Sequence, residues 1–158
     1  MQRAEEVRNL RAVASSSSQY GRFRLDQEDA INIARRMQYA KGVDPTLSIY
    51  AAYAYHDLQS IDRIKEMSEY LRGDVGATFF DLALLSGMLI NKRILPEDNT
   101  VPFFPLLSQG WALLRALRVK LHPELEGIEG TMRDSLWSLF NDAGLKQLKR
   151  AMMTKEVR

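Results

Sequence analysis

The residue types that usually carry out catalysis or bind metals are few in this chain of 158 residues. It contains no cysteine and two histidines, His56 and His122. A helical metal site typically pairs a histidine with a carboxylate three residues away, as in Glu-x-x-His, and neither histidine has such a neighbour. We interpret both as helix-end or loop residues with local hydrogen bonds, and we expect no metal ion and no other cofactor.

Nucleophilic and phosphate-binding motifs are also absent from the sequence. A serine nucleophile needs an activating base, and no Gly-x-Ser-x-Gly elbow occurs. The glycine pairs in Gly73–Gly76 and Gly127–Gly130 lack the Lys-Ser/Thr of a phosphate loop and are typical of turns. Asp62 and Glu66 lie one helical turn apart but alternate with basic residues, as on a solvated helix face. We expect no catalytic residue, and an enzyme whose site no spacing reveals remains the third alternative.

Basic residues gather at three places and could contact phosphates. The formal net charge of +2, from 22 Lys and Arg against 20 Asp and Glu, does not by itself imply a polyanionic partner. No aromatic platform or helix-turn-helix signature accompanies the clusters, so charge compensation at helix ends is favoured. The alternative is a nucleic-acid-binding domain that uses the last cluster. The clusters are Arg35 with Arg36; Arg115, Arg118 and Lys120; and Lys146, Lys149 and Arg150.

The segment Val101–Leu107 has the most unusual composition, because two prolines enclose apolar and aromatic residues in a loop. It either docks onto the core of its own domain or forms a lip that binds a partner. A nearby tryptophan and tyrosines interpreted as surface residues are of the types enriched at interfaces. The candidate partner-binding residues are Tyr50, Tyr53, Phe103, Phe104 and Trp111.

The elements that position these residues are predicted to be helices. Apolar residues recur at helical spacing, and no segment shows the alternation of a strand. The pattern predicts an all-α bundle or stack of helical hairpins, with about seven helices and no sheet. The longest apolar stretch, Phe79–Ile90, is too short to span a membrane. The absence of cysteine and of a signal peptide favours a cytoplasmic protein.

Caps and breakers indicate where each helix begins and ends. Proline and glycine are the strongest of these signals, together with Asp, Ser and Thr at helix starts. The expected helices run from Asp26 to Gly42, from Asp44-Pro45 to about Leu58, from Ser60 to Gly73, from Ala77 to Ile90, from Ser108 to His122, from Thr131 (with Asp134 completing a capping box) to about Phe140, and from Asp142 past Met152.

The first part of the chain differs in composition from the rest. A charged helix is expected over Arg3–Ala14, and the four serines that follow are typical of a linker. We therefore expect residues 1–22 to be a charged helix with a serine-rich linker and residues 23–158 to form a single helical domain. This arrangement favours a domain that belongs to a larger protein.

Two stretches, Asp44–Tyr55 (DPTLSIYAAYAY) and Pro102–Trp111 (PFFPLLSQGW), resemble segments of helical domains appended to bacterial caspase-like peptidases and defence signalling proteins. The resemblance covers under a quarter of the chain and implies an accessory domain, because the cysteine nucleophile of the caspases is missing. Tyr50–Tyr55 also resembles the first helix of a tetratricopeptide hairpin, although the glycine of that motif is missing and no second copy repeats it.

Together these features favour a non-catalytic helical domain for protein–protein interaction or scaffolding. We expect it to be the accessory domain of a bacterial multidomain protein. The expected partner is another protein or an attached domain rather than nucleic acid or a membrane. The sequence leaves the identity of the partner and the oligomeric state open.

Overall fold

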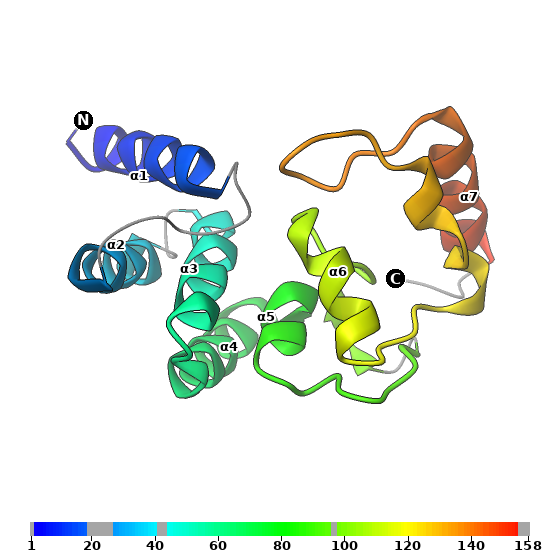
Figure 1. Cartoon of the computed structure of the whole chain (residues 1–158), viewed down its shortest axis with the longest axis horizontal. Helices are drawn as coiled ribbons and strands as arrows, with labels where there is room; N and C mark the ends of the chain where they lie inside the picture. The colour runs from blue at the N-terminus through cyan, green and yellow to red at the C-terminus, as the bar shows by residue number, and fades with distance from the viewer. Residues whose placement is uncertain (1, 19–26, 41–43, 96–97, 155–158) are drawn as a thin grey trace. The chain divides into compact units, whose positions relative to one another are not determined.

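The computed structural model describes residues 2–18, 27–40, 44–95 and 98–154. The chain forms two compact units, Met1–Tyr70 and Leu71–Arg158, which are described separately below. The described residues taken together are predominantly helical (Figure 1). The expected domain start at residue 23 lies outside the described residues. No helix in the described part of the chain is long and apolar enough to cross a membrane.

The first unit is built around one buried helix. Every residue of this helix from Leu47 to Tyr55 is buried, so the buried surface extends around its whole circumference. Two other helices pack against it (Figure 1), and one of them buries Ala30, Ala34 and Met37 at the helical spacing seen in the sequence. The buried helix is α3 (Thr46–Asp57), its neighbours are α1 (Gln2–Ser18) and α2 (Gln27–Ala40), and α4 (Ile61–Val75) begins in this unit.

The start of α3 confirms the signal read from Asp44-Pro45. The Asp44 carboxylate accepts hydrogen bonds from the backbone N–H and the hydroxyl of Thr46, at 3.1 and 2.7 Å. It also accepts a hydrogen bond from the Arg11 guanidinium of α1. Burial acts to raise the pKa of Asp44, but the hydrogen bonds from Arg11 and Thr46 outweigh it and hold the pKa below 3.8. Asp44 therefore holds Thr46, the first residue of α3, and ties α1 to this end of the helix.

Two predicted boundaries in this region are wrong. The serines Ser15–Ser18 continue α1 and do not form a linker in the part that the structure describes. Helix α4 passes through Gly73 and runs to Val75, because the residue with left-handed backbone geometry is Gly76, at φ +75°. The Gly76 N–H donates to the Arg72 carbonyl at 2.9 Å, closing the helix in the way glycine caps usually do.

The second unit contains two very short strands, so the prediction of no sheet is wrong. The strands pair in parallel, with Thr78 opposite Thr100 and Phe79 opposite Val101. Two residues are too few to show an alternating pattern in the sequence. The elements of this unit are β1 (Thr78–Phe79), α5 (Phe80–Leu85), β2 (Thr100–Val101), α6 (Gln109–Ala116), the 3-10 helices η2 (Pro123–Leu125) and η3 (Ile128–Thr131), and α7 (Asp142–Met153).

Three helices predicted in this unit are shorter or absent. The expected helix over 77–90 is reduced to α5, because β1 precedes it and Gly87 at φ +82° follows it. The helix expected to reach His122 ends at Ala116, and Arg118 has a left-handed φ of 54°. Residues 132–140 are irregular, so the predicted capping box starts no helix; isolated bridges pair Met132 with Phe140 and Leu107 with Trp137. The last helix, α7, begins where predicted, with Asn141 as its N-cap.

The core of the second unit draws on all its elements except the strands. Its buried members come from α5, α6 and α7 and from the segments between them, and they form one contiguous cluster. Among them are Phe80, Leu84, Ile94, Phe103, Trp111, Leu114, Val119, Leu125, Ile128, Phe140 and Ala151.

Candidate ligand-binding pocket

The two tyrosines predicted at the partner surface belong to the interior of the first unit. Tyr50 and Tyr53 are 2% and 3% exposed. The prediction that they are surface residues is wrong, because the packing of α3 leaves it no solvent-facing side between Leu47 and Tyr55. Tyrosines with large exposure occur elsewhere, at Tyr39 and Tyr70.

The three other candidates, Phe103, Phe104 and Trp111, meet in the second unit. The ring centroids of Phe103 and Phe104 lie 5.3 Å apart in an edge arrangement, and those of Phe104 and Trp111 lie 6.1 Å apart. Phe140 joins them, with its centroid 5.3 Å from Phe104 and 6.0 Å from Trp111. Phe103 and Trp111 are buried and Phe104 is half-buried against the core. Of the two interpretations of this loop, docking onto its own core is the one that the structure shows.

A buried carboxylate fixes this loop. Asp81 of α5 has no exposed surface, and its oxygens accept the backbone N–H groups of Leu106 at 2.8 Å and Leu107 at 3.3 Å. On the other side, the Ser138 hydroxyl donates to the Pro105 carbonyl at 2.6 Å and accepts from the Trp111 indole N–H at 2.7 Å. These bonds satisfy polar groups that burial would otherwise penalise, and they hold Trp111 in one orientation.

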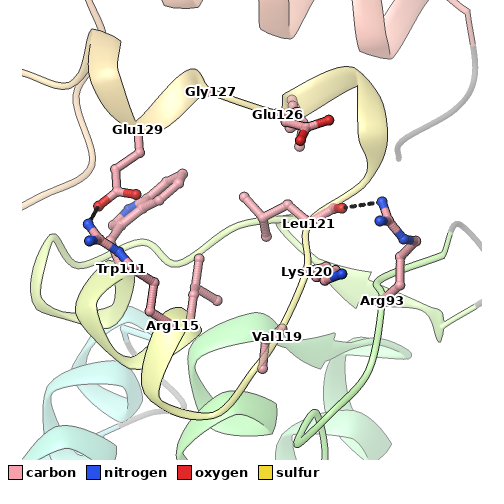
Figure 2. Close-up of a pocket in the computed structure, with 11 residues that line it drawn as sticks. Arg93, Trp111, Arg115, Val119, Lys120, Leu121, Glu126, Gly127 and Glu129 are labelled. Carbon is pink, nitrogen blue, oxygen red and sulfur yellow. Dashed lines mark hydrogen bonds and ion pairs between the residues drawn. The ribbon is translucent and has the colours of Figure 1, made fainter.

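Trp111 also lines a pocket in the surface of the second unit, which we call the Trp111 pocket. It has a volume of about 400 Å³, which lies within the range of small ligand sites. Its walls come from α6, from the segment that follows α6, and from η2 and η3 with the turn between them (Figure 2). The apolar lining consists of Trp111, Leu114, Val119, Leu121 and Leu125.

Backbone pairing gives this pocket its shape. After α6 ends, the chain turns at Arg118 and runs beside residues 91–94, with Lys120 N–H donating to the Lys92 carbonyl at 2.9 Å. The Ile94 N–H in turn donates to the Lys120 carbonyl at 2.8 Å. On the opposite wall Gly127 has a φ of 77°, which L side chains rarely adopt. The sequence therefore builds a short extended segment facing a tight turn, with an apolar floor between them.

The rim of the Trp111 pocket is charged. Arg115 and Glu129 form an ion pair with 2.8 Å between Nη2 and Oε1. Arg93 donates from Nη1 to the Leu121 carbonyl at 3.4 Å. Lys120 and Glu126 complete the charged lining, and neither has an ion-pair partner among the described residues. Such a rim can orient a charged group next to an apolar one.

The chemistry of this lining suits binding. Its side chains include no serine, threonine, cysteine or histidine, and its ionisable groups are Arg, Lys and Glu. Of the two histidines, His122 caps η2 by accepting the Glu124 N–H. Within residues 2–18, 27–40, 44–95 and 98–154, no group of three His, Asp or Glu residues is arranged to hold a metal ion. The pocket can therefore hold a ligand through an apolar floor and a charged rim.

The residues proposed for nucleic acid lie on α7 and outside the pocket. Lys146, Lys149 and Arg150 are exposed and have no ion-pair partner in the described part of the chain. Exposed apolar residues, Leu145 and Met152 among them, share the helix with these cations. The structure places the three cations together, as their spacing predicted.

Only part of this site is indicated by the amino-acid sequence. The sequence indicates Trp111 by its residue type and Arg115 and Lys120 by their charge, whereas Arg118 of the same basic cluster does not line the pocket. Arg93 and the acidic residues of the η2–η3 turn were missed, because their approach to α6 depends on pairing between distant segments. The only signal for it in the sequence was the pair of adjacent cations Lys92 and Arg93.

Comparison with known proteins adds no identification. No known family, curated protein or solved structure matches this chain.

Proposed function

We propose that this chain is a non-catalytic helical domain that binds a protein partner, and that the Trp111 pocket receives a side chain of that partner. The observation that carries the proposal is the pocket itself, an apolar floor inside a charged rim. Protein interfaces use the same arrangement, in which a buried anchor is surrounded by a polar rim.

The floor of the pocket favours an apolar anchor. Trp111, Leu114 and Leu125 are buried and fixed by the core, and Leu121 is half-buried with its side chain directed into the pocket (Figure 2). An aliphatic or aromatic side chain placed there would remove apolar surface from water on both molecules. Burying one such side chain contributes about 1.5–3 kcal/mol, which is the size of effect expected for an interface anchor.

A peptide library displayed on phage and selected against the full chain tests this proposal. Binders should converge on an aliphatic or aromatic residue, and Leu121→Ser should weaken them about tenfold because it makes the floor polar. Met153→Ser is the matched control, since Met153 is 84% exposed on α7 and lies outside the pocket. Binders that tolerate Leu121→Ser as well as Met153→Ser would place the interaction elsewhere.

Nucleic-acid binding is the second candidate, and the exposed cations of α7 favour it. If Lys146, Lys149 and Arg150 contact phosphates, affinity should fall steeply as salt rises, because binding releases counterions. A gel-shift assay at low salt with single- and double-stranded oligonucleotides tests this candidate. Absence of any shift at low salt would rule it out.

The resemblance of Asp44–Tyr55 and Pro102–Trp111 to accessory domains supports a role within a multidomain bacterial protein. In that case the partner of the Trp111 pocket can be a segment of an attached domain. The full reading frame tests the idea, because an adjoining peptidase or other effector domain is expected and an unrelated context would count against it.

A further inference from the structure

Two cations on the rim of the Trp111 pocket are held next to each other. Arg93 and Lys120 are opposite one another in a parallel bridge, and both line the pocket. Residues that face each other across such a bridge extend from the same side of the paired backbone. The two residues are 27 positions apart in the sequence, so their pairing is a product of the fold.

The charges of these two residues are not neutralised within the described structure. Arg115, the third cation of the rim, is engaged by Glu129 at 2.8 Å. Arg93 and Lys120 are exposed, and no carboxylate of the described residues lies within ion-pair distance of either. Two more exposed cations, Lys92 and Arg118, lie in the same pair of segments and add to the positive potential.

We infer that the Trp111 pocket selects an acidic peptide segment, in which glutamate or aspartate next to the apolar anchor contacts Arg93 and Lys120. This inference rests on the proposed function, since it names the partner chemistry of the same pocket. Exposed arginine and lysine side chains bind carboxylates through charge-assisted hydrogen bonds. Their contribution favours the correct partner and speeds encounter more than it adds affinity.

Glu126 makes one wall of the pocket negatively charged, opposite the positive charges of Arg93 and Lys120. It comes from the turn between η2 and η3, which faces Val119 and Lys120 across the pocket in Figure 2. A carboxylate of the ligand is repelled at that wall and attracted at the wall of Arg93 and Lys120. The acidic residue of the peptide is therefore placed toward the end of the pocket that residues 91–94 and 117–120 form.

A peptide fits these features better than nucleic acid does. Glu126 and Glu129 on the rim oppose a continuous phosphate backbone. A peptide with one or two carboxylates beside an apolar side chain fits this pocket, because its carboxylates can contact the basic side of the rim while the apolar side chain lies on the floor.

Two synthetic peptide pools provide the probes. Both pools vary one central position among aliphatic and aromatic residues. Glutamates flank this position in the first pool, and glutamines, which have the same size but no charge, flank it in the second. Binding to the full chain is measured by fluorescence anisotropy at low and at high salt. We expect the glutamate pool to bind about tenfold more tightly at low salt, an advantage that high salt reduces.

Charge variants of the chain assign this advantage to residues. Arg93→Glu with Lys120→Glu should abolish the preference for the glutamate pool, and Glu126→Gln should increase it about threefold. Lys146→Glu with Lys149→Glu on α7 is the matched control, because it changes the net charge equally and lies outside the pocket. Circular dichroism checks that each variant keeps its helices.

The outcomes separate the inference from the proposed function. Equal binding of both pools that is lost in Leu121→Ser would overturn the acidic preference and leave the pocket as a protein-binding site. Failure of both pools to bind the unmodified chain would count against the proposed function as well. An oligothymidine that binds more tightly than the glutamate pool, and is lost in the Arg93 and Lys120 variant, would assign this surface to nucleic acid and refute the inference.

Discussion

At the scale of single residues, two buried carboxylates fix where neighbouring segments meet. Asp44 ties α1 to the start of α3, and Asp81 holds the loop before α6 through two backbone N–H groups. The place of Asp44 at a helix start was readable from the sequence, because an aspartate before proline is a common helix start, but its ion pair with Arg11 was not. The role of Asp81 was not, since its partners lie 25 and 26 residues further along the chain.

The ion pair of Arg11 with Asp44 predicts a pH-dependent stability. The pKa of Asp44 is held below 3.8 in the folded chain, so the ionised carboxylate is favoured by folding. This stabilisation is fully present above the unfolded pKa and is lost as pH falls below about 3.8 through the folded value. Arg11→Gln should lower the free energy of unfolding by about 0.5–1 kcal/mol at neutral pH, a modest amount because Arg11 is largely exposed.

Urea unfolding at a series of pH values measures this effect, and the difference between Arg11→Gln and the unmodified chain should shrink toward acid. Arg36→Gln serves as control, because its ion pair with Glu6 at 3.2 Å is exposed on both sides and should contribute less. A difference for Arg11→Gln that stays constant down to the acid limit would show that the ion pair is not its source.

At the scale of elements, helices with strong end signals were predictable and short ones were not. The expected positions of α3 and α7 are confirmed, because an aspartate or asparagine marks the start of each. The expected helix over 77–90 contains enough apolar residues for a buried helix, but the pairing of Thr78 with Thr100 and the left-handed Gly87 limit it to α5. Tertiary pairing of this kind overrides local propensity and leaves no periodic trace.

The contact between α7 and η3 depends on a glycine. A Cβ on Gly144 would lie 2.1 Å from the Thr131 hydroxyl oxygen and 2.8 Å from the Phe140 Cβ. Thr131 donates to the Ile128 carbonyl at 2.7 Å, so moving its side chain aside also breaks a hydrogen bond. Gly144→Ala should therefore destabilise the chain by about 1–2 kcal/mol, although alanine is the better helix former.

Gly73→Ala on α4 is the matched control for this prediction, because nothing lies within 4 Å of the added Cβ. It should stabilise the chain by about 0.5–1 kcal/mol through helix propensity alone. Thermal or urea unfolding reads out both changes. The same sign for the two variants would contradict the close packing at Gly144.

At the scale of the whole molecule, neither the division after Tyr70 nor the Trp111 pocket could be predicted from the sequence pattern. The expected division lay near residue 23, because the serine run suggested a linker, whereas α1 extends through those serines. The pocket combines Arg93, α6, Lys120 and the η2–η3 turn. Periodicity reports the face of one helix and says nothing of which separate segments meet.

Because the chain forms two compact units, we expect a destabilising substitution in one unit to affect the stability of that unit alone. The second unit has its own contiguous core, and the first has its own buried helix, α3. Asp81→Ala leaves the buried N–H of Leu107 without its acceptor, which costs about 1–3 kcal/mol, and the half-buried N–H of Leu106 adds a smaller cost. Hydrogen exchange followed by mass spectrometry should then show faster exchange in residues 71–154 and unchanged exchange in α2 and α3.

Asp44→Ala should produce the converse pattern, because its partners Arg11 and Thr46 belong to the first unit. If either variant accelerates exchange equally in both regions, the chain unfolds as one cooperative unit in spite of its two cores.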